Sequence, residues 1–359
     1  MNTHASAIPP SSLLPEGRTV FGLNPDWGVE TLGEFAETTG VGPGAAVSFV
    51  ELPWDEGDVE NVTAAAEQIA EFNGVLMLTV EPVDGLGAVT PEVIEELVSV
   101  LRSINESGVP VLLRYAHEMN GSWYAWGQQP EEYVRSFREV AEAVQAAPAT
   151  EMLWAPNYAG GYPYSGGSYE AQPGSADHQA LDTDGDGDLT ESDDPYASYY
   201  PGDDVVDWVG MTIYHWGDSY PWGTDSMPEP DKFTQQLTGS YDGLGGDDTV
   251  FPDFYTEYAV ERDKPMAIPE TAAFVSADAD ADLSLEIKRS WWKQVFSDEV
   301  HESFEHIRLI SWFNWDKYEA EVDGLVRWSL TTDEATAEAF RADLPDWVLT
   351  SDDLEPQGP

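Results

Sequence analysis

Cysteine is absent from the chain of 359 residues. Disulfide bonds, thiolate metal sites and cysteine nucleophiles are therefore excluded, and cysteine usage does not indicate a redox compartment. Long hydrophobic runs are also missing, because no stretch approaches the roughly 18 consecutive apolar residues that a membrane-spanning helix needs. We therefore expect no membrane partner.

Basic side chains are scarce. The chain has 15 Lys and Arg against 68 Asp and Glu, which gives a formal net charge of −53. Such a surface repels polyanions, so we expect no nucleic-acid partner. The acids are interspersed with apolar and aromatic residues, including 14 Trp, which favours a folded protein over a disordered one. We interpret the charge as adaptation to a halophilic environment, where counterions screen self-repulsion; an acidic binding function is the alternative.

The two ends of the chain differ in composition from the middle. Residues 1–17 are rich in Ser and Pro and predict a disordered tether, and residues 351–359 predict a flexible tail. Residues 18–350 are expected to form a single catalytic domain. No Lys or Arg precedes Arg18 and no apolar run has signal length, so no secretory signal is visible, although a removed signal stays possible.

Eight short runs have strand character: 19–23, 46–50, 75–80, 109–115, 151–154, 205–213, 265–268 and 307–313. Most are continuously apolar, as expected for parallel strands that are buried on both faces. Amphipathic helical stretches lie between several of them, at 91–107, 130–146, 285–296 and 333–344. This alternation predicts a (β/α)8 TIM barrel. A doubly wound sheet is the alternative, but no GxGxxG motif follows the first strand.

The fourth predicted strand ends in the sequence HEMNG over residues 117–121, and Trp123, Tyr124 and Trp126 follow. A carboxylic acid at the C-terminal end of a barrel strand, surrounded by aromatic rings, is expected to act as a general acid with a raised pKa. Glu118 is therefore the first catalytic candidate. The alternative is a structural ion pair between Glu118 and Arg114.

The seventh predicted strand ends at Glu270. Strands four and seven of a barrel end on the same rim, so Glu118 and Glu270 can face each other across the mouth. Two carboxyl groups on one rim, among aromatic residues, are typical of glycoside hydrolysis, and a retaining mechanism needs them about 5–5.5 Å apart. Glu257 and Glu261 are competing candidates, although they lie in a helical stretch before the strand.

The run from Arg114 to Gly127, RYAHEMNGSWYAWG, resembles the acid/base motif of glycoside hydrolase family 26, which consists mainly of endo-β-1,4-mannanases. The resemblance extends from Phe21 to about Ser329 through the segments TVEP at 79–82, PET at 269–271 and WFNW at 312–315. It implies a retaining barrel hydrolase in which Glu118 is the acid/base and Glu270 the nucleophile. No cofactor is implied for catalysis.

The resemblance also implies a set of substrate-binding residues: Arg114, His117, Trp123, Trp126, Tyr214, Trp312 and Trp315. Arg114 and Tyr214 would hold the nucleophile, and His117 would lie near the scissile sugar. The implied partner is a β-linked polysaccharide or oligosaccharide, with β-1,4-mannan or glucomannan the main candidate. β-1,3-1,4-Glucan and β-1,3-xylan are alternatives within the family, and a non-catalytic carbohydrate-binding barrel is the alternative outside it.

We expect a monomer, and a polymeric substrate favours an extracellular location.

A long insert at 157–204 contains the sequence DTDGDGDLTESD over residues 182–193. Acids at positions 1, 3, 5 and 12 and Gly at position 6 fit an EF-hand loop, and Asp at position 12 resembles dockerin-type loops. The predicted ligands of a structural Ca²⁺ are Asp182, Asp184, Asp186, Asp188 and Asp193. Asp-Gly repeats that arise by chance in an acidic protein are the alternative. The stretch 171–180 is too polar to predict an entering helix.

Overall fold

A closed barrel of eight parallel strands forms the centre of the computed structural model, which describes residues 7–355. The strands are β1 (Thr19–Pro25), β2 (Ala45–Glu51), β3 (Val75–Glu81), β4 (Val111–Tyr115), β5 (Thr150–Trp154), β6 (Trp208–Gly210), β9 (Met266–Thr271) and β10 (Ile307–Asn314). Their order is β10-β9-β6-β5-β4-β3-β2-β1, and pairing of β1 with β10 closes the ring. The TIM barrel is therefore confirmed, and each predicted strand overlaps an observed one.

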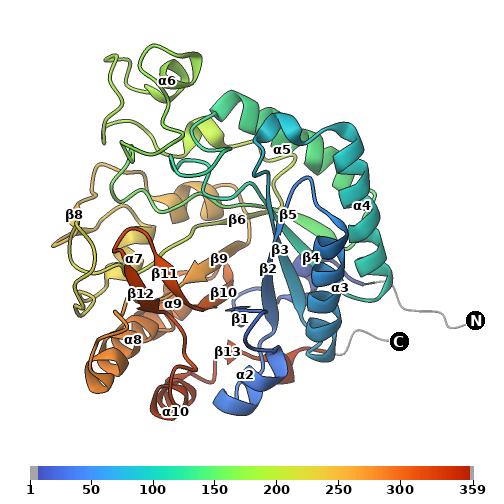
Figure 1. The fold of residues 1–359 in the computed structure, drawn as a ribbon, viewed down its shortest axis with the longest axis vertical. Helices are drawn as coiled ribbons and strands as arrows, with labels where there is room; N and C mark the ends of the chain where they lie inside the picture. Colours follow the sequence, from blue (N-terminus) through green and yellow to red (C-terminus); the bar gives the residue numbers. More distant parts are fainter. Residues whose placement is uncertain (1–6, 356–359) are drawn as a thin grey trace, which may run out of the picture.

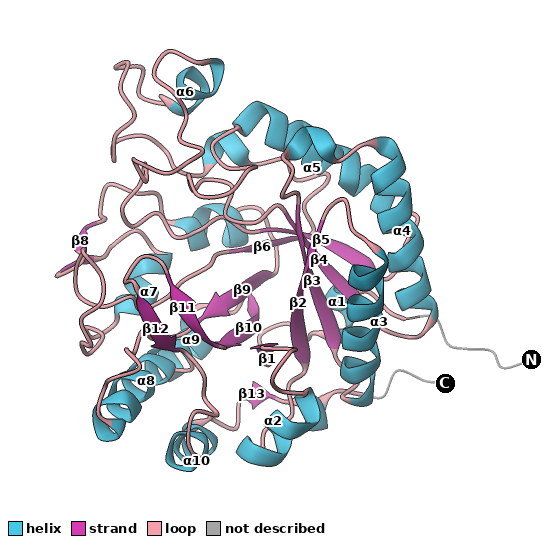
Figure 2. Ribbon diagram, in the orientation of Figure 1, coloured by secondary structure: helices cyan, strands magenta, loops and turns pink. Residues whose placement is uncertain are grey.

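Helices surround the barrel, apart from α6, which lies in a segment that extends from one side (Figures 1 and 2). They are α1 (Pro10–Leu13), α2 (Leu32–Thr39), α3 (Glu56–Glu71), α4 (Pro91–Glu106), α5 (Pro130–Val144), α6 (Ala176–Leu181), α7 (Lys232–Leu237), α8 (Ala281–Val295), α9 (Asp298–Ser303) and α10 (Glu334–Asp343). The predicted helices did not include α2 and α3, which begin with capping boxes at Thr31 and Asp55. No helix within residues 7–355 is both long and apolar enough to cross a membrane.

Three further short pairings lie outside the ring. β7 (Asp242–Gly243) pairs with β8 (Gly246–Asp247), β11 (Asp316–Glu319) pairs with β12 (Gly324–Arg327), and β13 (Val348–Leu349) lies beside β1. The hairpin β11–β12 directly follows β10, so it stands at the C-terminal end of the barrel strands. Figure 1 shows the long segments that carry α6 and β8 extending from one side of the barrel.

The segment predicted as a tether packs against the barrel from residue 7 onward. Leu14 is buried in the cluster that fills the barrel interior, and the backbone N–H of Ser11 donates to Glu151 on β5 at 2.8 Å. The apolar pair Leu13 and Leu14 explains this packing, because it covers the N-terminal end of the barrel. At the other end, Leu354 joins the same cluster, whereas residues 1–6 and 356–359 lie outside the described part of the chain.

Side chains of alternate residues fill the barrel interior. The interior cluster includes Val20, Val47, Met77, Leu112, Leu153, Trp208 and Leu309. Two residues further along their strands the interior becomes polar, with Thr79 after Met77, Arg114 after Leu112 and Ser311 after Leu309. The interior side chains therefore change from apolar to polar toward the C-terminal ends of the strands. Barrel enzymes have their active sites at this end.

Candidate active site

Glu118 is positioned by a tight turn that follows β4. Ala116 and Glu118 both have left-handed backbone conformations, with φ of 47° and 53°. Such conformations are costly for residues other than glycine and cluster at functional sites. The turn is fixed by hydrogen bonds from the N–H of Glu118 to the carbonyl of Ala155 at 3.0 Å and from the N–H of Gly121 to the carbonyl of Glu118 at 2.9 Å.

Glu270 is turned into the barrel by a bulge in β9. On β10, Ile310 and Trp312 are two residues apart, but their partners Ile268 and Thr271 on β9 are three residues apart. Ile268 belongs to the outer core, and the Thr271 hydroxyl accepts from the indole of Trp291 on α8, so both face outward. The extra residue allows Glu270 to face the interior, which strict alternation would not.

Arg114 and Tyr214 hold Glu270. Arg114 is fully buried, and its Nη1 forms an ion pair with Oε1 of Glu270, while its Nη2 donates to the hydroxyl of Thr212 at 2.7 Å. The hydroxyl of Tyr214 donates to Oε2 of Glu270 at 2.8 Å. Arg114 therefore pairs with Glu270 and not with Glu118, contrary to the ion-pair alternative considered from the sequence.

The two candidate carboxyl groups lie close together. One carboxylate oxygen of Glu118, one of Glu270 and a ring nitrogen of His117 all lie within 4.8 Å of one another. Burial, and secondly the charge of Glu270, raise the pKa of Glu118 to about 7. Burial and the nearby Arg114 lower the pKa of His117 well below its usual range, so its imidazole is neutral at ordinary pH.

Trp123 and Trp126 lie beside Glu118 at different depths. The indole N–H of Trp123 donates to Oε2 of Glu118 at 3.1 Å, and the residue is 38% exposed, so its ring can face a ligand. Trp126 is buried, stacks on Tyr124 at 4.4 Å and donates from its indole to the carbonyl of His117 at 2.7 Å. Trp126 was predicted to contact substrate, but its burial removes it from the cleft, and it instead holds the backbone of His117.

Trp312 does not reach the cleft. It is fully buried, and its ring faces Trp292 on α8 and Phe340 on α10. The regular alternation of β10 points Trp312 outward, so its predicted role at a sugar subsite is not supported. Trp315 is half-buried at the rim, where it stacks on Phe313 at 5.5 Å between ring centroids.

Two residues of the site were not identified from the sequence. Thr212 bonds the guanidinium of Arg114, and Trp328 packs on Tyr214 at 5.2 Å between ring centroids. Trp328 is brought there by the hairpin β11–β12, and its backbone N–H donates to the carbonyl of Trp315 at 3.1 Å. No local sequence signal distinguishes Trp328 from a core tryptophan.

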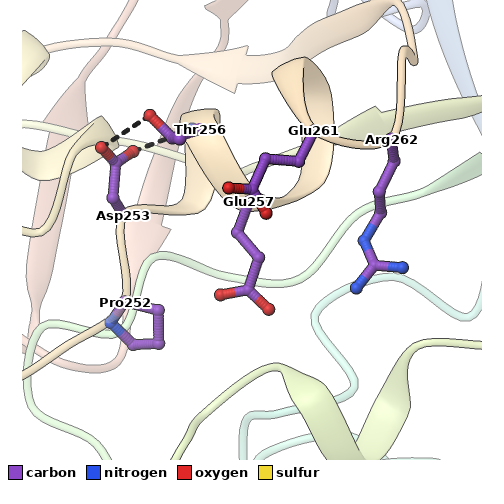
Figure 3. A pocket seen from close by; sticks show the side chains of 6 residues that line it. All are labelled: Pro252, Asp253, Thr256, Glu257, Glu261 and Arg262. Carbon is purple, nitrogen blue, oxygen red and sulfur yellow. Dashed lines mark hydrogen bonds between the residues drawn. The ribbon is translucent and has the colours of Figure 1, made fainter.

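The competing acids lie elsewhere. Glu257 belongs to the π-helical segment Tyr255–Val260 and Glu261 follows it; with Arg262 they line a surface pocket of about 340 Å³ (Figure 3). This segment precedes β9 in the chain and is joined to its N-terminal end by a short turn, in which the N–H of Lys264 donates to the carbonyl of Ala259. It therefore lies at the opposite end of β9 from Glu270.

The acidic loop in the insert has part of the predicted metal-ligand geometry. Carboxylate oxygens of Asp182, Asp184 and Asp193 lie within 4.8 Å of one another. Asp182 accepts from the N–H groups of Gly185 at 2.9 Å and Gly187 at 3.0 Å, which wraps the loop around it.

The other two predicted ligands, Asp186 and Asp188, are exposed and lie outside this group of three. The short helix α6 enters the loop, although the sequence did not predict an entering helix. An all-oxygen set of donors fits a hard cation such as Ca²⁺.

Comparison with known proteins finds a family match over part of the chain and one curated relative. Residues 72–160, which include β3 to β5 and Glu118, match the sequence profile of glycosyl hydrolase family 26. Endoglucanase H of Acetivibrio thermocellus is 23% identical over 296 residues, covering 79% of this chain and 26% of its own length. The chain thus spans about a quarter of that protein.

Solved structures share the fold. An endo-β-1,4-mannanase double mutant of Cellulomonas fimi matches with a TM-score of 0.62 and 19% identity, covering 99% of this chain and 78% of its own. The catalytic domain of a family 26 endo-β-1,4-mannanase from Bacillus sp. JAMB-750 matches with a TM-score of 0.54 and 17% identity, covering 96% and 92%.

Proposed function

We propose that the chain is a member of glycoside hydrolase family 26 and a retaining endo-β-glycanase whose main substrate is β-1,4-mannan or glucomannan. The observation that carries the proposal is the approach of carboxylate oxygens of Glu118 and Glu270 within 4.8 Å. Inverting enzymes separate their carboxyl groups by about 6.5–9.5 Å to admit a water molecule, so the short separation supports double displacement.

Glu118 is the proposed acid/base. In the first step its carboxyl proton passes to the glycosidic oxygen as the bond to the anomeric carbon breaks. A pKa of about 7 keeps Glu118 protonated in slightly acidic solution and still allows it to lose the proton in this step. In the second step the Glu118 carboxylate removes a proton from water, which attacks the anomeric carbon and releases Glu270.

Glu270 is the proposed nucleophile. Its carboxylate attacks the anomeric carbon and forms the glycosyl-enzyme ester. The ion pair with Arg114 and the hydrogen bond from Tyr214 fix the orientation of its carboxylate. His117 has a neutral imidazole, and because its Nδ1 is buried, the other ring nitrogen is the one proposed to bond a sugar hydroxyl beside this pair. Trp123 and Trp315 are proposed as aromatic platforms for the sugar rings.

The choice of mannan is supported by the two solved mannanases with this fold, whereas the curated relative is named an endoglucanase.

The test of the proposed function is reducing-sugar release from mannan, glucomannan, lichenan and β-1,3-xylan in concentrated salt. We expect mannan or glucomannan to be cleaved fastest. Glu118→Ala and Glu270→Ala should each lose about 10²–10⁴-fold in rate or more. Activity that survives both substitutions would refute the catalytic assignment, and binding without cleavage would indicate a carbohydrate-binding barrel.

We further propose that the acidic loop binds a structural Ca²⁺ through Asp182, Asp184 and Asp193, with Asp186 and Asp188 as additional ligands. The ion would offset the repulsion among three neighbouring carboxylates and hold the insert in place. The test is the melting temperature with Ca²⁺ or with a chelator at fixed ionic strength. We expect Ca²⁺ to raise it, and Asp182→Asn to abolish the increase. Glu191→Gln, the same charge change in the same loop, is the matched control and should retain the increase.

A further inference from the structure

Glu81 stands at the mouth of the barrel beside the catalytic pair. Met77 belongs to the interior cluster, and alternation along β3 places Thr79 and then Glu81 on the same face. Thr79 pairs in register with Arg114 on β4. Glu81 lies two residues after Thr79 on β3, so it is closer to the C-terminal end of the barrel than Arg114. Its carboxyl group is therefore directed to the same cleft as Glu118 and Glu270.

This carboxyl group has no partner of its own. Glu81 is half-buried, and within residues 7–355 its side chain forms neither a hydrogen bond nor an ion pair within the usual limits. Arg114 is already bonded to Glu270 and Thr212. The other charged groups that act on Glu81 are like charges, namely its register partner Glu51 on β2 and the catalytic pair. Burial and the charge of Glu270 raise the pKa of Glu81 to about 7.

A partly buried carboxyl group without a partner destabilises a fold unless a ligand supplies the missing hydrogen bonds. Sugar hydroxyls can do so in either protonation state, because a carboxylate accepts from them and a carboxylic acid both donates and accepts. An anionic ligand is disfavoured, because Glu51 and Glu270 add negative charge on both sides.

We propose that Glu81 is a further substrate-binding residue, which bonds hydroxyl groups of an uncharged sugar unit of the glycan on the β2–β3 side of the catalytic pair. This inference rests on the proposed function. It also specifies the substrate class, because a uronic acid at that position would be repelled by the carboxyl groups of Glu51, Glu81 and Glu270.

The test is calorimetric titration of mannopentaose and cellopentaose into the Glu270→Ala protein, which binds but does not cleave, at pH 8 in concentrated salt. We expect E81A in this background to weaken the binding of the better ligand about tenfold or more. E81Q keeps one acceptor and one donor, so we expect about a threefold loss. E96Q, on the exposed face of α4, is the matched control and should leave the affinity unchanged.

Unchanged affinity in E81A would overturn the inference while leaving the proposed function intact. If E81A does not fold, the nearly isosteric E81Q decides, and parental affinity in E81Q would overturn the inference. Failure of both pentaoses to bind the Glu270→Ala protein with Glu81 intact would refute the proposed function itself, and the inference with it.

Discussion

At the scale of single residues, two glutamates at strand ends acquire different properties from their surroundings. Glu118 is buried and receives a hydrogen bond from the indole of Trp123. Glu270 receives a guanidinium and a phenol hydroxyl. The first environment favours a neutral acid and the second binds and orients the attacking group, which is the division of roles that a retaining glycosidase requires.

The pKa of Glu118 predicts the alkaline limit of activity. Because Glu118 must be protonated to act as the acid, kcat/KM should fall as pH rises through about 7. The indole of Trp123 stabilises the ionised form, so Trp123→Phe should raise the pKa of Glu118 and move this limit to higher pH. Trp315→Phe is the control, since Trp315 bonds neither carboxyl group; an equal displacement in both variants would contradict the assignment.

The same pKa predicts a stability effect. The pKa of Glu118 is raised from 4.5 to about 7 in the folded protein, so the folded state binds more protons than the unfolded state between these values. The free energy of unfolding therefore falls as pH rises through this window. Glu118→Gln cannot ionise and should be about 2–3 kcal/mol more stable than the parent at pH 8, but not at pH 4. Denaturant unfolding at both pH values measures this, and equal stability at pH 8 would show that burial does not penalise the charge.

At the scale of elements, the sequence predicted which residues end the strands but not where their side chains point. The eight strands were predictable because their apolar runs are nearly continuous, and Glu118 and Glu270 followed as strand-end residues. The bulge that turns Glu270 inward depends on the register between β9 and β10, which no local pattern specifies. Trp312 was misassigned because its strand-end position was taken to put it in the cleft, whereas the regular alternation of β10 turns its side chain outward.

The bulge also predicts the effect of a substitution on β6. A Cβ at Gly210 would lie 2.7 Å from the carbonyl oxygen of Ala267 and 3.5 Å from the ring of Pro269, within the bulged segment. Gly210→Ala should therefore displace β9, lower the free energy of unfolding by about 1–3 kcal/mol and reduce kcat. Gly33→Ala, on the exposed side of α2, meets nothing closer than 4.0 Å and is the control. Full activity in Gly210→Ala would show that the bulge does not set the position of Glu270.

At the scale of the whole molecule, the net charge of −53 governs behaviour in solution. With 68 acids and 15 bases, most carboxylates have no cation to pair with. Their repulsion acts over a Debye length of about 10 Å in 0.1 M salt, which shrinks to about 3 Å in 1 M salt. Screening should therefore stabilise the fold, in keeping with the proposed halophilic adaptation.

We expect the melting temperature to rise steadily between 0.1 and 2 M NaCl. Sucrose at matched osmolality is the control for exclusion effects, which do not screen charge. The buffer is saturated with Ca²⁺ throughout, so that the rise in melting temperature with NaCl does not include cation binding at the acidic loop. A melting temperature that stays level or falls with NaCl would contradict the salt-adaptation interpretation.

The central claim is that Glu118 and Glu270 act on one glycosidic bond, with Glu270 as the nucleophile. The most direct measurement is mass spectrometry of the proteolysed enzyme after reaction with 2-deoxy-2-fluoro glycosyl fluorides of manno and gluco configuration, which trap the glycosyl-enzyme. The account predicts one sugar attached to Glu270, and none in Glu270→Ala. A label on Glu118, or on any other carboxyl group, would contradict it.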